Sequence, residues 1–212
     1  MPSQKIVFDL DDFSIQNKEA FELLRRIKEH YPNMKVSMFT IPLPLAIRKR
    51  IIPEKEHEKF MKALPEYDWI EICPHGVSHI EQEGLYPKRK KQAKDYIFLS
   101  EKLFKRYGVP FQKIFKAPFW QANDLVYDEL KRRDYTVAVD RNNVPKGEFK
   151  KYIYNWSIDD PHIPDVPIIK AHGHLDVTSS NSIFKAYKNF TQCIESDAEF
   201  IFISDYIKNE KT

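Results

Sequence analysis

The sequence predicts one α/β domain of about seven to eight mostly parallel strands. Short apolar runs alternate with helical patterns from end to end, which is typical of βα units and a largely parallel sheet. The chain has 212 residues, enough to bury a substantial core but few enough that one domain over 1–212 is the default. With 42% hydrophobic and 31% charged residues, the composition is that of a globular protein. Periodicity does not decide between a closed barrel and an open doubly wound sheet.

Each expected element has its own signal. Apolar runs of strand length cover 5–11, 35–41, 69–75, 113–119, 135–140, 152–158, 167–172 and 199–204. Helical patterns lie between them, near 17–31, 54–64, 88–107, 123–133 and 181–195. The first helix repeats buried-type residues along one face, at Ala20, Leu24, Ile27 and Tyr31, and the third does so from Ala93 to Tyr107. Both faces are expected to pack against the sheet.

The charge balance excludes one class of partner. The 34 basic residues nearly cancel the 31 acidic ones and leave a formal net charge of +3, so no nucleic-acid partner is expected. The start of the third helix carries a basic cluster, made of Lys88, Arg89, Lys90, Lys91 and Lys94. We interpret it as a solvated helix face, with contact to an anionic glycan or lipid surface as the alternative.

The N-terminus and the cysteines predict a cytoplasmic protein without a membrane span. Met1 leads within a few residues into an apolar strand, without a basic region, an apolar stretch of signal length or a cleavage site. Cys73 and Cys193 lie far apart and lack the spacing of a disulfide framework or a zinc cluster. The sequence leaves the oligomeric state open.

The first strand ends in three carboxylates within four positions, Asp9, Asp11 and Asp12. In a barrel and in an open sheet alike, the carboxyl ends of parallel strands gather at one mouth. Repulsion and desolvation would both oppose ionisation there, so a positive group is expected beside the carboxylates. A solvated strand end is the plainer alternative, because Asp is common in turns.

The third strand ends in two imidazoles four residues apart, His75 and His79. On one helical turn this spacing brings both rings to one side, as in histidine pairs that chelate a metal. Two histidines joined by a carboxylate from the first strand leave positions open for water and substrate. Cys73 shares a strand face with His75 and is expected to lie beneath the site as a small buried residue, without being a ligand.

The seventh strand ends in His172 and His174. Histidine is the usual proton shuttle near neutral pH, although either residue, and His174 in particular, is as readily a strand cap. The other histidines, His30, His57 and His162, fall in helix or loop contexts and are expected on the surface.

The order of these motifs resembles the polysaccharide deacetylase family, carbohydrate esterase family 4, over most of the chain. The matching features run in the order Asp11-Asp12, His75-x-x-x-His79, Lys116-Ala117-Pro118-Phe119, a tryptophan and a strand-end histidine. The resemblance implies a distorted (β/α) barrel and a hydrolase that removes an N-acetyl or O-acetyl group from a sugar or glycan precursor. Without a signal peptide, an intracellular precursor is expected rather than a mature cell-wall polymer.

The resemblance also assigns roles to residues. It implies that Asp12, His75 and His79 hold one divalent cation, with zinc favoured over cobalt, nickel or manganese. It implies Asp11 as the catalytic base, with Lys116 beside it lowering its pKa. A backbone N–H near Phe119 would stabilise the oxyanion, and His172 would protonate the leaving amine. Substrate contacts are expected from Trp120, Trp156 and His174, with Trp156 walling the acid.

Two positions depart from the family pattern. Phe13 stands where the family usually has glycine, and Lys116 replaces an arginine whose planar fork can grip a carboxylate at two points. Lysine can still neutralise Asp11 as a point charge, so a divergent member is expected.

Two other functions compete with deacetylation. Phe8-Asp9-Leu10-Asp11-Asp12 also resembles the opening motif of haloacid-dehalogenase-like phosphatases, which would make Asp9 a nucleophile and Asp11 an acid and base around magnesium. Phe13 replaces the threonine expected there, and the histidines would have no role. A non-catalytic glycan-binding relative is the further alternative, because the chain is rich in aromatic residues.

Overall fold

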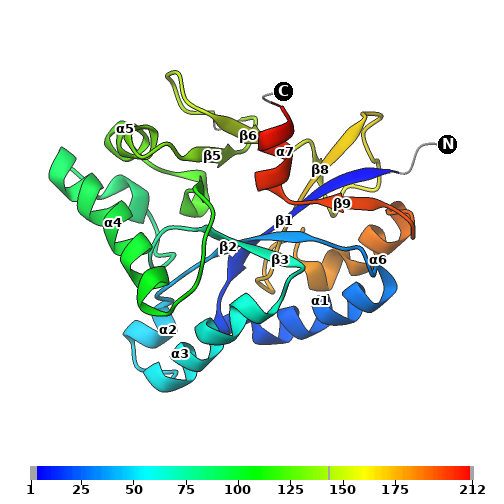
Figure 1. The fold of residues 1–212 in the computed structure, drawn as a ribbon, viewed down its shortest axis with the longest axis horizontal. Helices are drawn as coiled ribbons and strands as arrows, with labels where there is room; N and C mark the ends of the chain where they lie inside the picture. The colour runs from blue at the N-terminus through cyan, green and yellow to red at the C-terminus, as the bar shows by residue number, and fades with distance from the viewer. Residues whose placement is uncertain (1–3, 143, 211–212) are drawn as a thin grey trace.

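The strands form two parallel sheets in a computed structural model that describes residues 4–142 and 144–210. The larger sheet has the order β3 (Ile70–Pro74), β2 (Val36–Thr40), β1 (Lys5–Phe13), β8 (Ile168–His174) and β7 (Trp156–Ser157), and β9 (Glu199–Ile201) also pairs with β1 (Figure 1). The smaller sheet has the order β4 (Ile114–Lys116), β5 (Thr136–Val139) and β6 (Lys151–Ile153). Every pair of strands is parallel, so the predicted α/β class is confirmed.

The two sheets enclose a common interior. Gln112 N–H donates to the Ile72 carbonyl over 2.8 Å, which joins β3 to the segment before β4. A buried cluster draws residues from β1 to β6 and from α7 (Ile203–Asn209), namely Val7, Phe39, Cys73, Ile114, Ala138, Tyr152 and Ile203. The strands therefore surround one core as in a distorted barrel, although the described ladders do not close into a ring. Cys73 lies in this core, as expected.

All eight predicted strands are present, five of them within two residues of the expected ends, and the other three depart further from the expectation. The run 152–158 divides into β6 and β7, because the side chain of Asn155 bonds to the backbone of β8 at Ile168 and Lys170. The run 113–119 stops at Lys116, since Pro118 lacks an N–H and opens a 3₁₀ turn, Pro118–Trp120. The run 199–204 ends at Ile201, where α7 follows.

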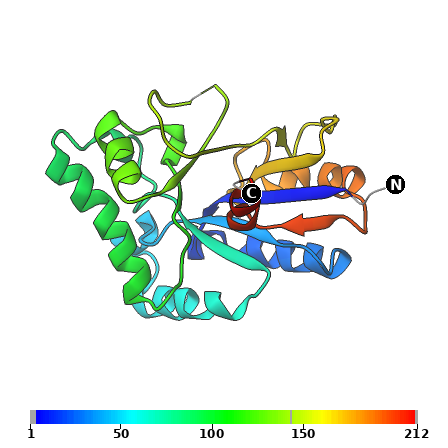
Figure 2. The same cartoon turned by 45° about the horizontal axis from the view of Figure 1, so that its top comes forward.

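The five predicted helices pack on the outside of the sheets. They are α1 (Lys18–His30), α3 (Glu54–Ala63), α4 (Lys90–Arg106), α5 (Asp124–Arg132) and α6 (Ile183–Cys193). Helices α1 and α6 lie side by side under the larger sheet, and α4 and α5 lie together beside the smaller one (Figures 1 and 2). Helix α2 (Leu45–Arg48) and helix α7 were not expected, because each is too short to show a periodic pattern.

The surface expectations hold with one exception. Lys88, Arg89, Lys90, Lys91 and Lys94 are all exposed, and so are His30 and His162. The prediction for His57 was wrong: the ring is fully buried, Nε2–H donates to the Pro42 carbonyl over 2.9 Å, and Tyr107 packs against it. Burial lowers the pKa of His57, so the ring is neutral at neutral pH. In the described part of the chain, no helix is long and apolar enough to cross a membrane.

Candidate active site and metal centre

The predicted site residues meet at the carboxyl ends of the strands, around a cavity of about 710 Å³. Chemically active side chains on its wall come from β1, the loop after β3 and β8, and they are Asp11, Asp12, His75, His79 and His174. Further lining residues follow β4 and β8, and include Phe119, Trp120 and Asp176. Three other segments thus bring groups to the same opening as β1, as expected for parallel strands.

A β-bulge in β1 turns two neighbouring aspartates towards the same cavity. Strand alternation would place Asp11 and Asp12 on opposite faces. The register with β2 shifts between Leu10 and Phe13, and Asp12 has a left-handed backbone with φ of 67°. Asp tolerates this conformation better than most residues, and the Asn17 side chain holds the Asp12 carbonyl at 2.6 Å. Both carboxylates consequently line the cavity.

Asp12, His75 and His79 form a group whose ligand atoms lie within 4.8 Å of one another. Nε2 of His79 is 2.9 Å and Nε2 of His75 is 3.7 Å from Oδ1 of Asp12. The helical turn expected for the two histidines is absent, because Gly76 and His79 both have positive φ values of 67° and 53°. A loop with two left-handed residues brings the rings together instead, with 5.0 Å between their centroids.

The buried carboxylate of Glu83 shapes this histidine loop. Its two oxygens accept the backbone N–H groups of Val77 at 2.8 Å and Ser78 at 3.1 Å, and Tyr96 donates its hydroxyl at 3.0 Å. A Cβ atom at Gly76 would lie 1.8 Å from Glu83 Oε1, so the loop and the carboxylate require glycine there. Glu83 was not expected, since nothing in the sequence distinguishes it from other acidic residues.

Hydrogen bonding fixes which nitrogen of His75 is free. Nδ1 lies 2.9 Å from the Lys116 carbonyl, which can only accept, so Nδ1 carries the proton and Nε2 keeps its lone pair towards Asp12. Burial lowers the pKa of His75 to about 4, which keeps the ring neutral. Burial alone would lower the pKa of His79 as well, but its contact with Asp12 outweighs burial and raises it.

Lys116, the last residue of β4, connects the two other carboxylates to His172. Its Nζ donates to Asp9 Oδ1 over 2.6 Å and to Asp11 Oδ1 over 2.8 Å, and lies 3.3 Å from Nδ1 of His172. The His172 ring in turn contacts Asp9 Oδ1 over 2.8 Å. This is the positive group that the three carboxylates predicted.

The charges in this network decide the protonation of Asp11. Burial alone would raise the pKa of its carboxyl, but the charge of Lys116, with the imidazoles of His172 and His75, holds that pKa well below its usual range. Burial would likewise lower the pKa of Lys116, and Asp11 with Asp9 raises it instead. Asp11 is therefore an ionised carboxylate beside an ammonium. Burial and the charge of Lys116 lower the pKa of His172, so its ring is neutral at neutral pH.

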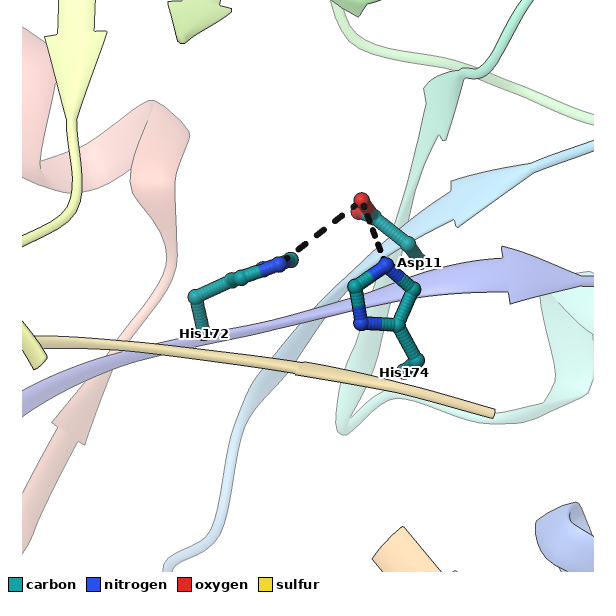
Figure 3. A group of neighbouring side chains, drawn as sticks. All are labelled: Asp11, His172 and His174. Atoms are coloured by element: carbon teal, nitrogen blue, oxygen red, sulfur yellow. Dashed lines mark ion pairs between the residues drawn. The ribbon is translucent and has the colours of Figure 1, made fainter. Parts of the chain in front are cut away.

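Asp11, His172 and His174 form a second group of potential ligand atoms within 4.8 Å of one another (Figure 3). Nε2 of His172 lies 3.9 Å and Nε2 of His174 lies 3.7 Å from Oδ2 of Asp11. His174 lines the cavity, whereas His172 is 1% exposed. Nδ1 of His174 contacts Asn181 Oδ1 over 2.8 Å.

Aromatic rings enclose His172, but the expected tryptophan is not among them. Trp156 is 2% exposed, stacks on Phe190 and donates its indole N–H to the Asp160 carbonyl, so it belongs to the core and the prediction was wrong. Trp120 lies against His172 with 5.2 Å between ring centroids, and Tyr154 lies at 4.7 Å. Trp156 faces the core because its place in the register with β8 is opposite Ala171.

Phe119 and Trp120 sit at the cavity rim in a strained turn. Their φ values are 54° and 60°, unusual for aromatic residues, and Phe119 is exposed at the mouth. The Phe119 ring lies 4.5 Å from that of His79. Strain of this kind often accompanies functional sites, because the surroundings must hold the turn in place.

The site geometry does not support a phosphatase. In that interpretation Asp9 attacks phosphorus, but its carboxylate is fully buried and held by Lys116 and His172. Asp9 is also not among the residues that line the cavity.

Parallel strands around one core, with an Asp-His-His group at their carboxyl ends, define a barrel-like α/β protein with a candidate metal centre. Its fold is that of the family 4 carbohydrate esterases, the polysaccharide deacetylases, so the family resemblance is confirmed at the level of fold. No protein-family profile matches the sequence, and no curated protein matches it either.

Three solved structures illustrate the likeness. A family 4 acetyl xylan esterase from Clostridium thermocellum, in complex with a cobalt ion, has a TM-score of 0.64 at 12% identity over 99% of this chain and 93% of that one. A family 4 domain of a multidomain xylanase from the hindgut metagenome of Trinervitermes trinervoides has a TM-score of 0.62 at 12% identity, over 99% of this chain and 92% of that one. A family 4 pseudoenzyme from Bacillus anthracis has a TM-score of 0.59 at 11% identity, over 96% of this chain and 65% of that one. At these identities the likeness concerns the fold alone.

Proposed function

We propose that this protein is a metal-dependent hydrolase that removes an acetyl group from an N-acetylated or O-acetylated sugar or glycan precursor. The observation that carries the proposal is the convergence of Asp12, His75 and His79 beside an ionised Asp11 in one open cavity. Metal-dependent deacetylation uses a Lewis acid next to a base, and this arrangement supplies places for both.

The three residues fit a divalent cation. Oδ1 of Asp12 is buried and makes no hydrogen bond of acceptable geometry, although Nε2 of His79 lies 2.9 Å away. The lone pair of His75 Nε2 faces the same oxygen, and the Lys116 carbonyl orients the ring from behind. Two nitrogens and one carboxylate oxygen favour zinc, with cobalt, nickel or manganese as alternatives. A bound cation would polarise the acetyl carbonyl and lower the pKa of water to about 7.

Asp11 is suited to act as the base. Its carboxylate lines the cavity, is ionised because of Lys116, and keeps Oδ2 clear of the ammonium that binds Oδ1. In the proposed reaction it takes a proton from the water that attacks the acetyl carbonyl.

His172 is suited to return the proton to the leaving group. The ring is neutral at rest, so in the proposed reaction it takes the proton from Asp11 after the side chains close the 3.9 Å between Asp11 Oδ2 and its Nε2 to hydrogen-bond distance. Asp9 stabilises the imidazolium that forms, since its carboxylate contacts Nδ1 over 2.8 Å. The proton then passes to the departing amine or alcohol, and acetate is the other product. His174, with 20% of its side chain exposed at the cavity, is the alternative donor.

The substrate would bind against the rim. Trp120 and Phe119 offer aromatic faces on which a sugar ring can stack, and a backbone N–H near Phe119 would stabilise the developing oxyanion. Asp176 lines the same cavity, and its Oδ1 is buried without a hydrogen-bond partner among the described residues.

The test is acetate release from a panel of N-acetylated and O-acetylated sugars and oligosaccharides. Metal-free protein and protein reloaded with zinc, cobalt, nickel or manganese would be compared, with Asp11→Asn as the matched control that retains the ligands. We expect release only from the reloaded wild type. Metal binding without release from any substrate would refute the catalytic proposal and favour the glycan-binding alternative.

A further inference from the structure

Asp11, His172 and His174 have the arrangement of a second cation site, separate from the Asp12 group. Figure 3 shows both rings directed at the Asp11 carboxylate, with their Nε2 atoms 3.9 and 3.7 Å from Oδ2. Bonds of about 2.0–2.2 Å at tetrahedral angles would separate ligand atoms by about 3.3–3.6 Å. The two distances to Asp11 exceed this range by a few tenths of an ångström, and all three ligand atoms lie within 4.8 Å of one another, so small side-chain movements would complete a three-ligand site.

Both imidazoles are held in the tautomer that a metal requires. Nδ1 of His172 faces the Asp9 carboxylate and Nδ1 of His174 faces the Asn181 amide oxygen, each at 2.8 Å. These oxygens accept, and the Lys116 ammonium lies farther from Nδ1 of His172, at 3.3 Å, so we assign the protons to Nδ1 and the lone pairs to Nε2. The Asn181 amide is itself fixed, because its nitrogen donates to Ser157 Oγ over 3.2 Å. A carboxylate or amide behind each ring is the usual support of a metal-bound histidine.

One of the two nitrogens is buried without a partner. Nε2 of His172 makes no hydrogen bond among the described residues, and the residue is 1% exposed. Its lone pair instead faces the negatively charged Oδ2 of Asp11, a contact that is unfavourable unless a proton or a cation lies between the two atoms.

Local charge and access favour a cation, although less strongly than at the Asp12 group. The carboxylates of Asp9, Asp11 and Asp12 are all buried at this mouth, against one ammonium, that of Lys116, in the contacts described above. Asp11 and His174 line the cavity, so an ion can reach them. Lys116 lies 2.8 Å from the other oxygen of Asp11 and repels a second positive charge, so this site is the weaker of the two.

We propose that Asp11, His172 and His174 bind a second divalent cation, which fills after the Asp12 group and inhibits the enzyme. The inhibition rests on the proposed function, because an ion bound there occupies the lone pairs of both the base and the acid. Metal binding itself does not depend on that function.

The experiment counts ions and measures where they bind. Untagged protein would be dialysed against increasing zinc and analysed for metal, with cobalt absorption as a second measure of coordination. We expect two ions per wild-type chain and one in His174→Ala, while His162→Ala, which removes an exposed histidine, keeps two. Asn181→Ala should weaken the second ion by about 10- to 100-fold, as loss of a supporting group does elsewhere. Acetate release should rise as the first ion binds. It should then fall on the order of 10²-fold as the second ion binds, because general acid–base catalysis usually contributes at least this factor.

The outcomes separate this inference from the proposed function. One ion in the wild type that survives His174→Ala and is lost in His79→Ala would overturn the inference and leave the primary centre standing. One ion lost in His174→Ala and kept in His79→Ala would support the Asp11 site and refute the primary centre. Two ions without inhibition would overturn the inhibitory role.

Discussion

Nζ of Lys116 donates to Oδ1 of Asp11 over 2.8 Å, in a contact where neither side chain is more than 3% exposed. The centroid of the buried Phe39 ring lies 4.0 Å from the same ammonium. The charge pair therefore separates the apolar interior from the cavity, and Asp11 stays ionised although it is buried.

Lys116→Met should remove the charge that keeps Asp11 ionised. The pKa of Asp11 then rises, because burial is no longer opposed, so the acid limb of kcat/KM should move to higher pH. The unpaired carboxylates should also cost about 3–5 kcal/mol of unfolding free energy, as for other broken buried pairs. A pH–rate profile and chemical unfolding measure the two effects. Lys116→Arg keeps the charge and is the control; an unshifted acid limb in Lys116→Met would contradict the role given to the lysine.

Removing a ligand of the Asp12 group should release the primary metal without unfolding the protein. His79→Ala is the cleaner variant, since His79 is partly exposed in a loop, whereas His75 is buried. Metal content at one equivalent of zinc should drop in His79→Ala, in His75→Ala and in Asp12→Asn, while the circular dichroism spectrum stays unchanged. Phe119→Leu changes a ring in contact with His79 that offers no ligand, and should keep the metal. Full metal content in the two histidine variants would rule out this ligand set.

The aspartates of β1 should respond differently to conversion to asparagine. Asp11→Asn should keep the primary metal and lose acetate release, because the base is gone. The Asp9 carboxylate accepts from both Lys116 and His172, so Asp9→Asn should lower kcat and stability together. Metal content, kcat and thermal unfolding would be compared. A phosphorylated intermediate on Asp9 would instead establish the phosphatase interpretation.

Glu83→Gln should loosen the loop that presents His75 and His79. An amide can accept fewer of the N–H groups of Val77 and Ser78 and brings a donor that has no acceptor there, so unfolding free energy should fall by about 1–3 kcal/mol. Zinc affinity should fall as well, measured by competition with a chelator. Tyr96→Phe removes one hydrogen bond to the same carboxylate and leaves the loop N–H groups bonded, so it should change affinity less. Equal zinc affinity in Glu83→Gln and wild type would contradict a role for Glu83 in positioning His75 and His79 for the metal.

Much of the fold and site was predictable because it depends on local pattern. Strand and helix positions follow from apolar periodicity, and Asp11, Asp12, His75, His79 and His174 all reach the cavity because parallel strands end at one mouth. The sequence also indicated that a cation must neutralise the carboxylates, which Lys116 does.

What the sequence did not predict depends on register and backbone dihedrals. The pairing of Asp9 with His172 follows from the alignment of β1 with β8, and Trp156 turns to the core for the same kind of reason. Asp and His adopt a left-handed backbone more often than most residues, but this tendency does not distinguish Asp12 and His79 from the other aspartates and histidines of the sequence. His57 looks like a helix-surface residue until Tyr107 is packed against it.

The two strand-end histidines should be separable by kinetics at one equivalent of metal, where the second ion is absent. His172→Ala should lower kcat by about 10²- to 10⁴-fold with the primary metal retained, the range expected for loss of a general acid. Both rings face the Asp11 carboxylate with Nε2, but Nδ1 of His172 contacts the charged carboxylate of Asp9, whereas Nδ1 of His174 contacts the neutral amide of Asn181. The protonated form of His172 therefore has a second carboxylate to stabilise it. His174→Ala should therefore affect KM more than kcat, because this ring lines the cavity.

Initial rates with a single acetylated substrate, with metal content measured on the same samples, decide between the rings. Near-wild-type kcat in His172→Ala, with collapse in His174→Ala, would reassign proton donation to the more exposed histidine and leave the base and the metal centre unchanged. Full activity in both variants would exclude both imidazoles. The leaving group would then have to receive its proton from another group, and Asp11 could deliver it directly because its carboxylate lines the cavity.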